Sequence, residues 1–108
     1  MSKFDQFSES VMAGSKALAK EVFGGFEENA KADARAFLER AESDLRRWTA
    51  LLATGEITER DFADLVLAKK TLADIYSLTQ AGLALTQLER FRSGMIDLVI
   101  DSAFDVFM

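Results

Sequence analysis

Residues 51–65 read LLATGEITERDFADL, and this stretch determines where the chain reverses direction. Gly55 follows a helical pattern and suits the left-handed residue that ends a helix. Thr58 suits the N-cap of the next helix, and Asp61 lies three residues later, at the position of a capping box. The stretch therefore predicts a helix, a tight turn at Gly55 and a second helix.

The sequence on both sides of this turn is typical of helices rather than strands. The chain of 108 residues has no proline and only 6 glycines, which is too few turn-forming residues for a β fold with many tight turns. The double glycine Gly24-Gly25 marks a second break, because the glutamates that follow it suit the start of a new helix. We predict a single all-helical domain spanning residues 1–108. Its helices are expected at about 2–23, 26–53 and 59–107.

The lengths of these helices favour one long antiparallel hairpin. At 1.5 Å per residue, the helix that begins near residue 59 would extend about 75 Å, and the two earlier helices together match that length. The first arm of this hairpin is broken at Gly24-Gly25, and two hairpins would assemble into a four-helix bundle. The alternative is a compact three-helix up-down bundle in which the first helix folds back at the double glycine.

The hairpin also predicts which residues face each other. A turn near Gly55 pairs residues whose numbers sum to about 112. Phe4 and Phe7 would then lie near the segment 104–107, and Leu18 would lie near Gly94.

The C-terminal stretch SGMIDLVIDSAFDVFM is apolar around most of a helix, and its three aspartates recur every four residues. Asp97, Asp101 and Asp105 would form the one stripe that faces water. The segment 75–88 contains no charged residue, which is unusual for a helix with an exposed face. We expect both segments to be covered by a second copy of the chain. The expected interface residues are Tyr76, Thr79, Leu83, Met95, Ile96, Val99, Ile100, Phe104 and Phe107.

The composition removes several classes of chemistry. Because the chain has no cysteine and no histidine, it has no disulfide or thiolate metal site, and it lacks the commonest general base and transition-metal ligand. It contains no glycine-rich phosphate loop, nucleophile elbow or HExxH motif. A formal net charge of −5 argues against nucleic acid as a partner. We expect no enzymatic activity, no cofactor and no metal.

These observations favour a non-catalytic, self-associating helical protein, most simply a dimer with coiled-coil-like packing, which acts as a scaffold or a protein–protein interaction module. No apolar run approaches the ~20 residues that a membrane span needs, and we expect a cytoplasmic location.

Two other functions stay open. Residues 4–23, FDQFSESVMAGSKALAKEVF, resemble the granule-coating phasins. The resemblance implies an amphipathic protein that coats a lipid surface or a storage granule. The second alternative is a bundle that binds a small ligand through Tyr76, Gln80 and Gln87 together with a carboxylate.

Overall fold

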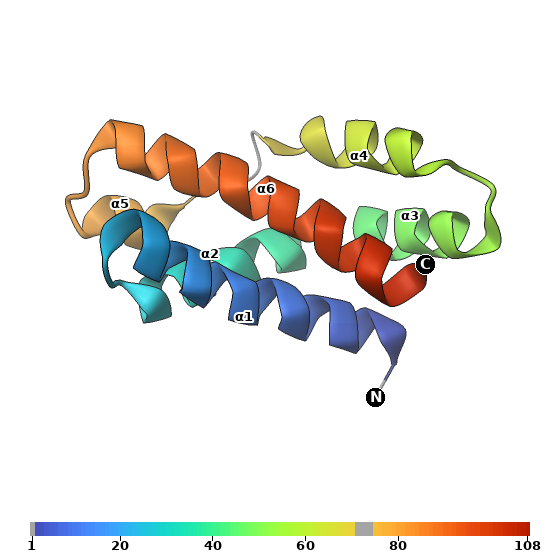
Figure 1. Cartoon of the computed structure of the whole chain (residues 1–108), viewed down its shortest axis with the longest axis horizontal. Coiled ribbons are helices and arrows are strands. Elements are labelled where there is room, and N and C mark those ends of the chain that lie inside the picture. Colours follow the sequence, from blue (N-terminus) through green and yellow to red (C-terminus); the bar gives the residue numbers. More distant parts are fainter. Residues whose placement is uncertain (1, 71–74) are drawn as a thin grey trace.

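The chain passes four times along the bundle in alternating directions, and we call the helices of each pass a rod (Figure 1). The computed structural model describes residues 2–70 and 75–108. The first rod is α1 (Lys3–Phe23), and the second is α2 (Glu27–Arg40) followed by α3 (Glu42–Thr54). The third is α4 (Glu59–Leu67) followed by α5 (Tyr76–Gln80), and the fourth is α6 (Leu85–Phe107). Neither described range contains a strand, and the predicted all-helical class is confirmed.

The helix ends follow the local chemistry of the sequence. The Thr58 side chain accepts the Asp61 backbone N–H at 3.1 Å, and the Asp61 carboxylate accepts the Thr58 N–H at 3.1 Å. This is the predicted capping box. Gly55 has φ 78° and ends α3, and Gly24 has φ 71° and ends α1. Both predicted breaks are therefore confirmed, but the break at Gly24-Gly25 is a full turn that folds α1 back against α2, as in the three-helix alternative, and not a break within one extended arm of a hairpin (Figure 1).

The predicted pairing of the first and last helices is also confirmed. The helix α6 lies against α1 and runs in the opposite direction (Figure 1). A Cβ atom built on Gly94 would lie 2.8 Å from Leu18 Cδ2, which shows how closely these two residues meet. At the open end, the rings of Phe7 and Phe107 lie 6.1 Å apart between centroids. Both termini lie at this end of the bundle (Figure 1).

One predicted helix is wrong. The segment 59–107 is not a single helix: α4 ends at Leu67, and the chain turns back between α5 and α6, where Gly82 has φ 76°. Residues 71–74, which the predicted helix included, lie outside the described residues. The predicted helix 26–53 is also divided, at Ala41, into α2 and α3.

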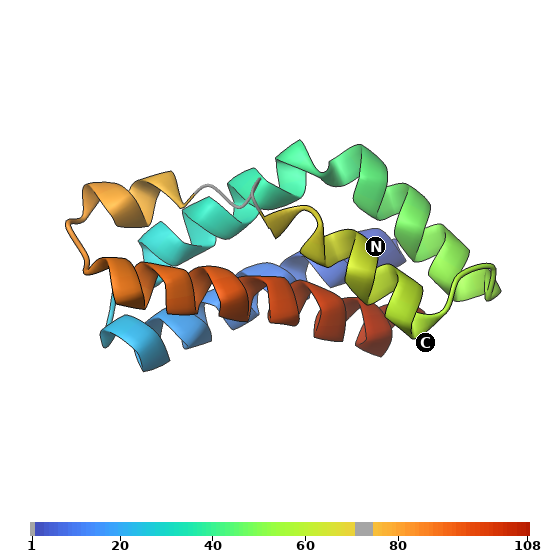
Figure 2. The same cartoon turned by 90° about the horizontal axis from the view of Figure 1, so that it is seen from above.

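The fold-back at Gly82 has a physical reason. In an extended hairpin α6 would pack against one rod only, whereas here it contacts α1, α3 and α4 (Figure 2). Each additional Å² of buried apolar surface stabilises the fold by about 25 cal/mol. The four-helix bundle predicted for two chains, with a three-helix bundle as the alternative, is therefore completed within one chain.

Side chains from all four rods fill the core. Phe7, Phe37, Phe62 and Phe91 are fully buried, one from each rod. The molecule measures 42 × 27 × 21 Å along its principal axes.

A buried carboxylate joins the second and third rods. Asp33 of α2 accepts the backbone N–H groups of Ser77 and Leu78 at 2.9 Å each. One turn earlier, Asn29 Nδ2 donates to Ser77 Oγ at 2.8 Å. The side chain of Ile75, the N-cap residue of α5, provides no hydrogen bond. A residue from a neighbouring helix therefore takes the role that an N-cap side chain normally has.

Candidate interaction surfaces

The predicted interface residues of the C-terminal segment lie inside the bundle. Met95, Ile96 and Val99 are at most 1% exposed, and Ile100 is also buried. Phe104 is half-buried against Phe62, at 6.0 Å between ring centroids. Phe107 is half-buried and meets Phe7. The apolar character of this segment is thus accounted for by contacts within one chain.

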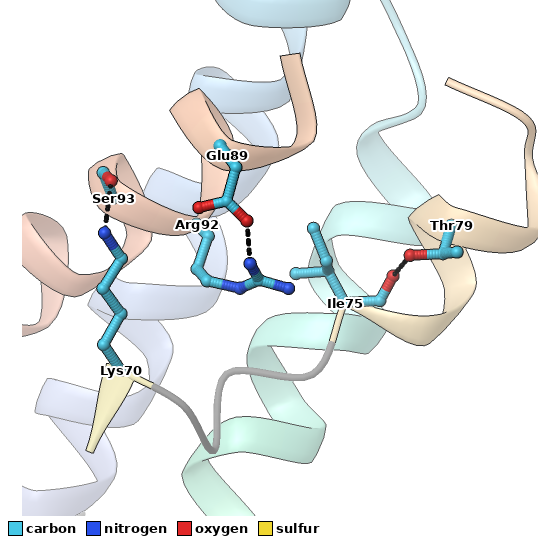
Figure 3. A network of polar contacts seen from close by, with 6 residues as sticks. All are labelled: Lys70, Ile75, Thr79, Glu89, Arg92 and Ser93. Atoms are coloured by element: carbon cyan, nitrogen blue, oxygen red, sulfur yellow. Dashed lines mark hydrogen bonds and ion pairs between the residues drawn. The ribbon is translucent and has the colours of Figure 1, made fainter. Parts of the chain in front are cut away.

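The predicted interface residues outside α6 lie apart from that core. Tyr76 is 64% exposed, Thr79 is exposed and Leu83 is half-buried. The Thr79 hydroxyl donates to the Ile75 carbonyl oxygen at 2.9 Å within α5 (Figure 3). Tyr76, Thr79 and Leu83 therefore do not form one exposed surface with the predicted interface residues of α6, which are buried or half-buried. Self-association through the nine predicted residues stays a prediction.

Two polar contacts lie near α5 (Figure 3). Lys70 Nζ donates to Ser93 Oγ at 2.9 Å, which joins the residues after α4 to α6, and Arg92 pairs with Glu89 on α6. Ser93 and Glu89 also line an open depression of about 650 Å³ along α6, and Tyr76 and Gln80 are not among its lining residues. Gln87, one of the residues predicted for a ligand site, donates to the Val22 carbonyl oxygen at 3.4 Å. Tyr76 and Gln80, the other two, are exposed rather than enclosed.

A groove of about 260 Å³ lies between α1 and α6. It forms because Gly14 and Gly94 let the two helices approach closely, and Leu18 and Leu98 fill the space above the glycines. We call it the acidic groove. Its lining residues are Gly14, Ala17, Leu18, Glu21, Gly94, Asp97, Leu98 and Asp101.

The acidic groove carries three carboxylates and no basic lining residue. Glu21 comes from α1, and Asp97 and Asp101 come from the predicted aspartate stripe, whose three members are exposed as expected. Within residues 2–70 and 75–108, no ion pair joins any of these three lining carboxylates to a basic side chain. The groove therefore presents uncompensated negative charge beside half-buried leucines.

A second groove, of about 400 Å³, lies on the other side of α1, between α1 and α2. We call it the basic groove. Its lining residues are Glu9, Met12, Ala13, Lys16, Lys31 and Arg35.

Two of the three basic residues of this second groove have unpaired charges. Lys16 forms an ion pair with Glu28 at 3.4 Å. Lys31 and Arg35 are one turn apart on α2, and neither has an acidic partner in the part of the chain that the structure describes. The sequence signal for this groove is the i,i+4 spacing of Lys31 and Arg35, but the contribution of α1 depends on the tertiary structure.

The described residues contain no group of three or more acidic side chains arranged to hold a metal ion, and no buried side-chain polar atom among them lacks a hydrogen-bond partner. The pKa of Asp44 is lowered, chiefly by a hydrogen bond from Lys69 and then by the charges of Lys69 and Arg47, while burial opposes them. Asp44 belongs to α3, which lines neither groove.

Comparison with known protein families, with curated proteins and with solved structures finds no match for this chain. Of the helices in the described ranges, none is both long enough and apolar enough to cross a bilayer.

Proposed function

We propose that this chain is a non-catalytic scaffold protein that associates with itself through charged surface grooves. The observation that carries the proposal is the opposite charge of the two grooves on either side of α1. Complementary charges speed encounter and select orientation, and they suppress contact between surfaces of like sign. The acidic groove of one molecule can therefore attract the basic groove of a second copy.

Each groove also offers apolar surface for such a contact. Leu18 and Leu98 lie in the acidic groove, and Met12 and Ala13 lie in the basic one. Exposed ion pairs alone contribute only about 0.2–1 kcal/mol each to binding. Burying these apolar side chains in the interface would add to the binding free energy that the ion pairs provide.

The net charge of −5 opposes association only weakly at short range. At physiological ionic strength charges are screened over about 8 Å, so the charges that face each other decide the outcome. The lack of cysteine supports a cytoplasmic location as part of the same proposal.

Sedimentation across a range of protein concentrations tests this function. We expect masses above the 12.0 kDa of one chain at micromolar concentration and low salt. At 1 M salt, where screening acts within about 3 Å, the mass should fall to that of one chain. A mass of one chain at every concentration and salt would contradict the proposal.

A second candidate is the coating of a lipid or storage-granule surface. It is favoured by Phe26, which is 41% exposed, and by Leu85, which is 80% exposed. Phe26 lies in the α1–α2 connection and Leu85 directly follows the α5–α6 connection, and both connections lie at one end of the bundle (Figure 1). Co-flotation with neutral vesicles or polyester particles tests it. Binding that is lost in the double variant Phe26→Ser, Leu85→Ser would support it, and no binding by the natural chain would exclude it.

A further inference from the structure

The acidic and basic grooves are separate surfaces of one molecule, and both use α1. A contact between two different patches of identical chains is heterologous, and it continues into a ring or an open filament. Resting on the proposed self-association, we propose that the acidic groove of one chain binds the basic groove of a second copy. The chains then assemble head to tail.

Charge decides between this arrangement and a twofold contact made through one groove alone. Two acidic grooves facing each other would bring Glu21, Asp97 and Asp101 against the same three carboxylates. Two basic grooves would bring the Lys31 and Arg35 charges of both chains together, and Glu9, the one carboxylate that lines this groove, offsets only part of that repulsion. Like charges placed face to face across an interface repel each other, whereas an acidic groove attracts a basic one.

The size of the molecule is compatible with such a contact. The bundle is 42 Å long and 27 Å wide, and a stable protein interface covers about 800 Å² per partner. The lining side chains reach the contact without refolding, because the grooves lie on the outer surface of α1, α2 and α6.

Two variants separate the two grooves. The triple variant Glu21→Gln, Asp97→Asn, Asp101→Asn removes the charge of the acidic groove. The double variant Lys31→Gln, Arg35→Gln removes the two unpaired positive charges of the basic groove and leaves Glu9 in place. Each is expected to weaken self-association by about two- to thirtyfold, because two exposed ion pairs together contribute about 0.4–2 kcal/mol and about 1.4 kcal/mol corresponds to a factor of ten.

The matched controls change the same number of charges outside both grooves. Glu39→Gln, Asp64→Asn, Asp105→Asn matches the acidic triple variant, and Lys3→Gln, Arg60→Gln matches the basic double variant. All of these residues are exposed, so the controls should fold and should assemble as the natural chain does.

Mixing the two groove variants is the decisive measurement. Each keeps one intact groove, so the mixture should form a pair of chains and stop there, whereas the natural chain should exceed two chains as its concentration rises. A natural chain that stops at two, or groove variants that assemble like their controls, would overturn the head-to-tail arrangement and leave self-association intact. A natural chain that is a single chain under all conditions would overturn both proposals.

Discussion

The Asp33 carboxylate of α2 accepts the backbone N–H of Leu78 in α5 at 2.9 Å, so one rod caps a helix of the next. Asp33 is 3% exposed, and its other carboxylate oxygen accepts the Ser77 N–H at the same distance. The start of α5 is thereby held on α2 by polar contacts, beside the buried side chains of Ile75 and Leu78.

Replacing this carboxylate should therefore destabilise the fold. In Asp33→Ala the N–H groups of Ser77 and Leu78 lose their acceptor, and each unpaired buried donor costs about 1–3 kcal/mol. We expect the free energy of unfolding in urea to fall by about 2 kcal/mol or more. The control Asp64→Ala, at an exposed position of α4, should change it by less than about 0.5 kcal/mol. Equal stability of the two variants would show that the cap has no energetic role.

The substitution Gly14→Ala tests the close approach of α1 and α6. A Cβ atom there would lie 2.6 and 2.7 Å from the two δ-carbons of Leu98 and 3.1 Å from its Cγ, so the whole isobutyl group would have to move. Overpacking costs about 1–3 kcal/mol, while alanine gains about 1 kcal/mol over glycine within a helix. We expect Gly14→Ala to destabilise the natural chain by about 1 kcal/mol net.

The same substitution should have the opposite sign once the leucine is shortened. In the Leu98→Ala background the added methyl meets no branched side chain, and the helix preference of alanine should stabilise the protein by up to about 1 kcal/mol. Urea unfolding of the four variants in a double-mutant cycle measures this coupling. An identical effect of Gly14→Ala in both backgrounds would exclude the contact.

Burial of α6 within its own chain predicts how a core variant behaves. Ile96 is 1% exposed, and Ile96→Ala should lower the free energy of unfolding by about 2–5 kcal/mol. Measured at 1 M salt, where the proposed assembly is screened, this loss should be the same at low and high protein concentration. Leu85→Ala, at a side chain 80% exposed, is the control and should have little effect. A loss that depends on protein concentration would instead place Ile96 in an interface.

The ion pair between Lys69 and Asp44, at 2.8 Å, predicts a dependence of stability on acid pH. The folded-state pKa of Asp44 lies below its ordinary value of 3.8, so the unfolded chain binds the proton more tightly. The stabilisation is therefore fully present above that ordinary value and is lost as the pH falls through the lowered folded pKa.

Asp44→Asn removes this contribution at every pH. The difference in thermal stability between the natural chain and Asp44→Asn should be larger at pH 6 than at pH 2. Asp105→Asn serves as the comparison, because Asp105 is exposed and no ion pair joins it to another residue of the described ranges. A difference for Asp44→Asn that stays constant across this range would contradict the assignment.

The sequence by itself determined the features that depend on a few neighbouring residues. The capping box of Thr58 and Asp61, the helix ends at Gly24 and Gly55, and the all-helical class all follow from short-range preferences. The facing of Leu18 and Gly94 agrees with the predicted sum of about 112, although α1 and α6 are not the two arms of one hairpin. The second and third rods lie between them in the chain and extend about equally far on either side of the Gly55 turn, so the sum is preserved.

Only the tertiary structure decided that the chain turns back before α6 and that α6 contacts α3 and α4 as well as α1. No proline marks the break before α6, and residues 75–88 give only the weak signal of Gly82. The break is stable because Asp33, 45 residues from Leu78, supplies the cap, and because four rods cover apolar faces that two rods leave open. Helix ends and caps depend on residues within about one helical turn of each other. The burial of α6 and the two grooves beside α1 depend instead on contacts between residues far apart in the chain.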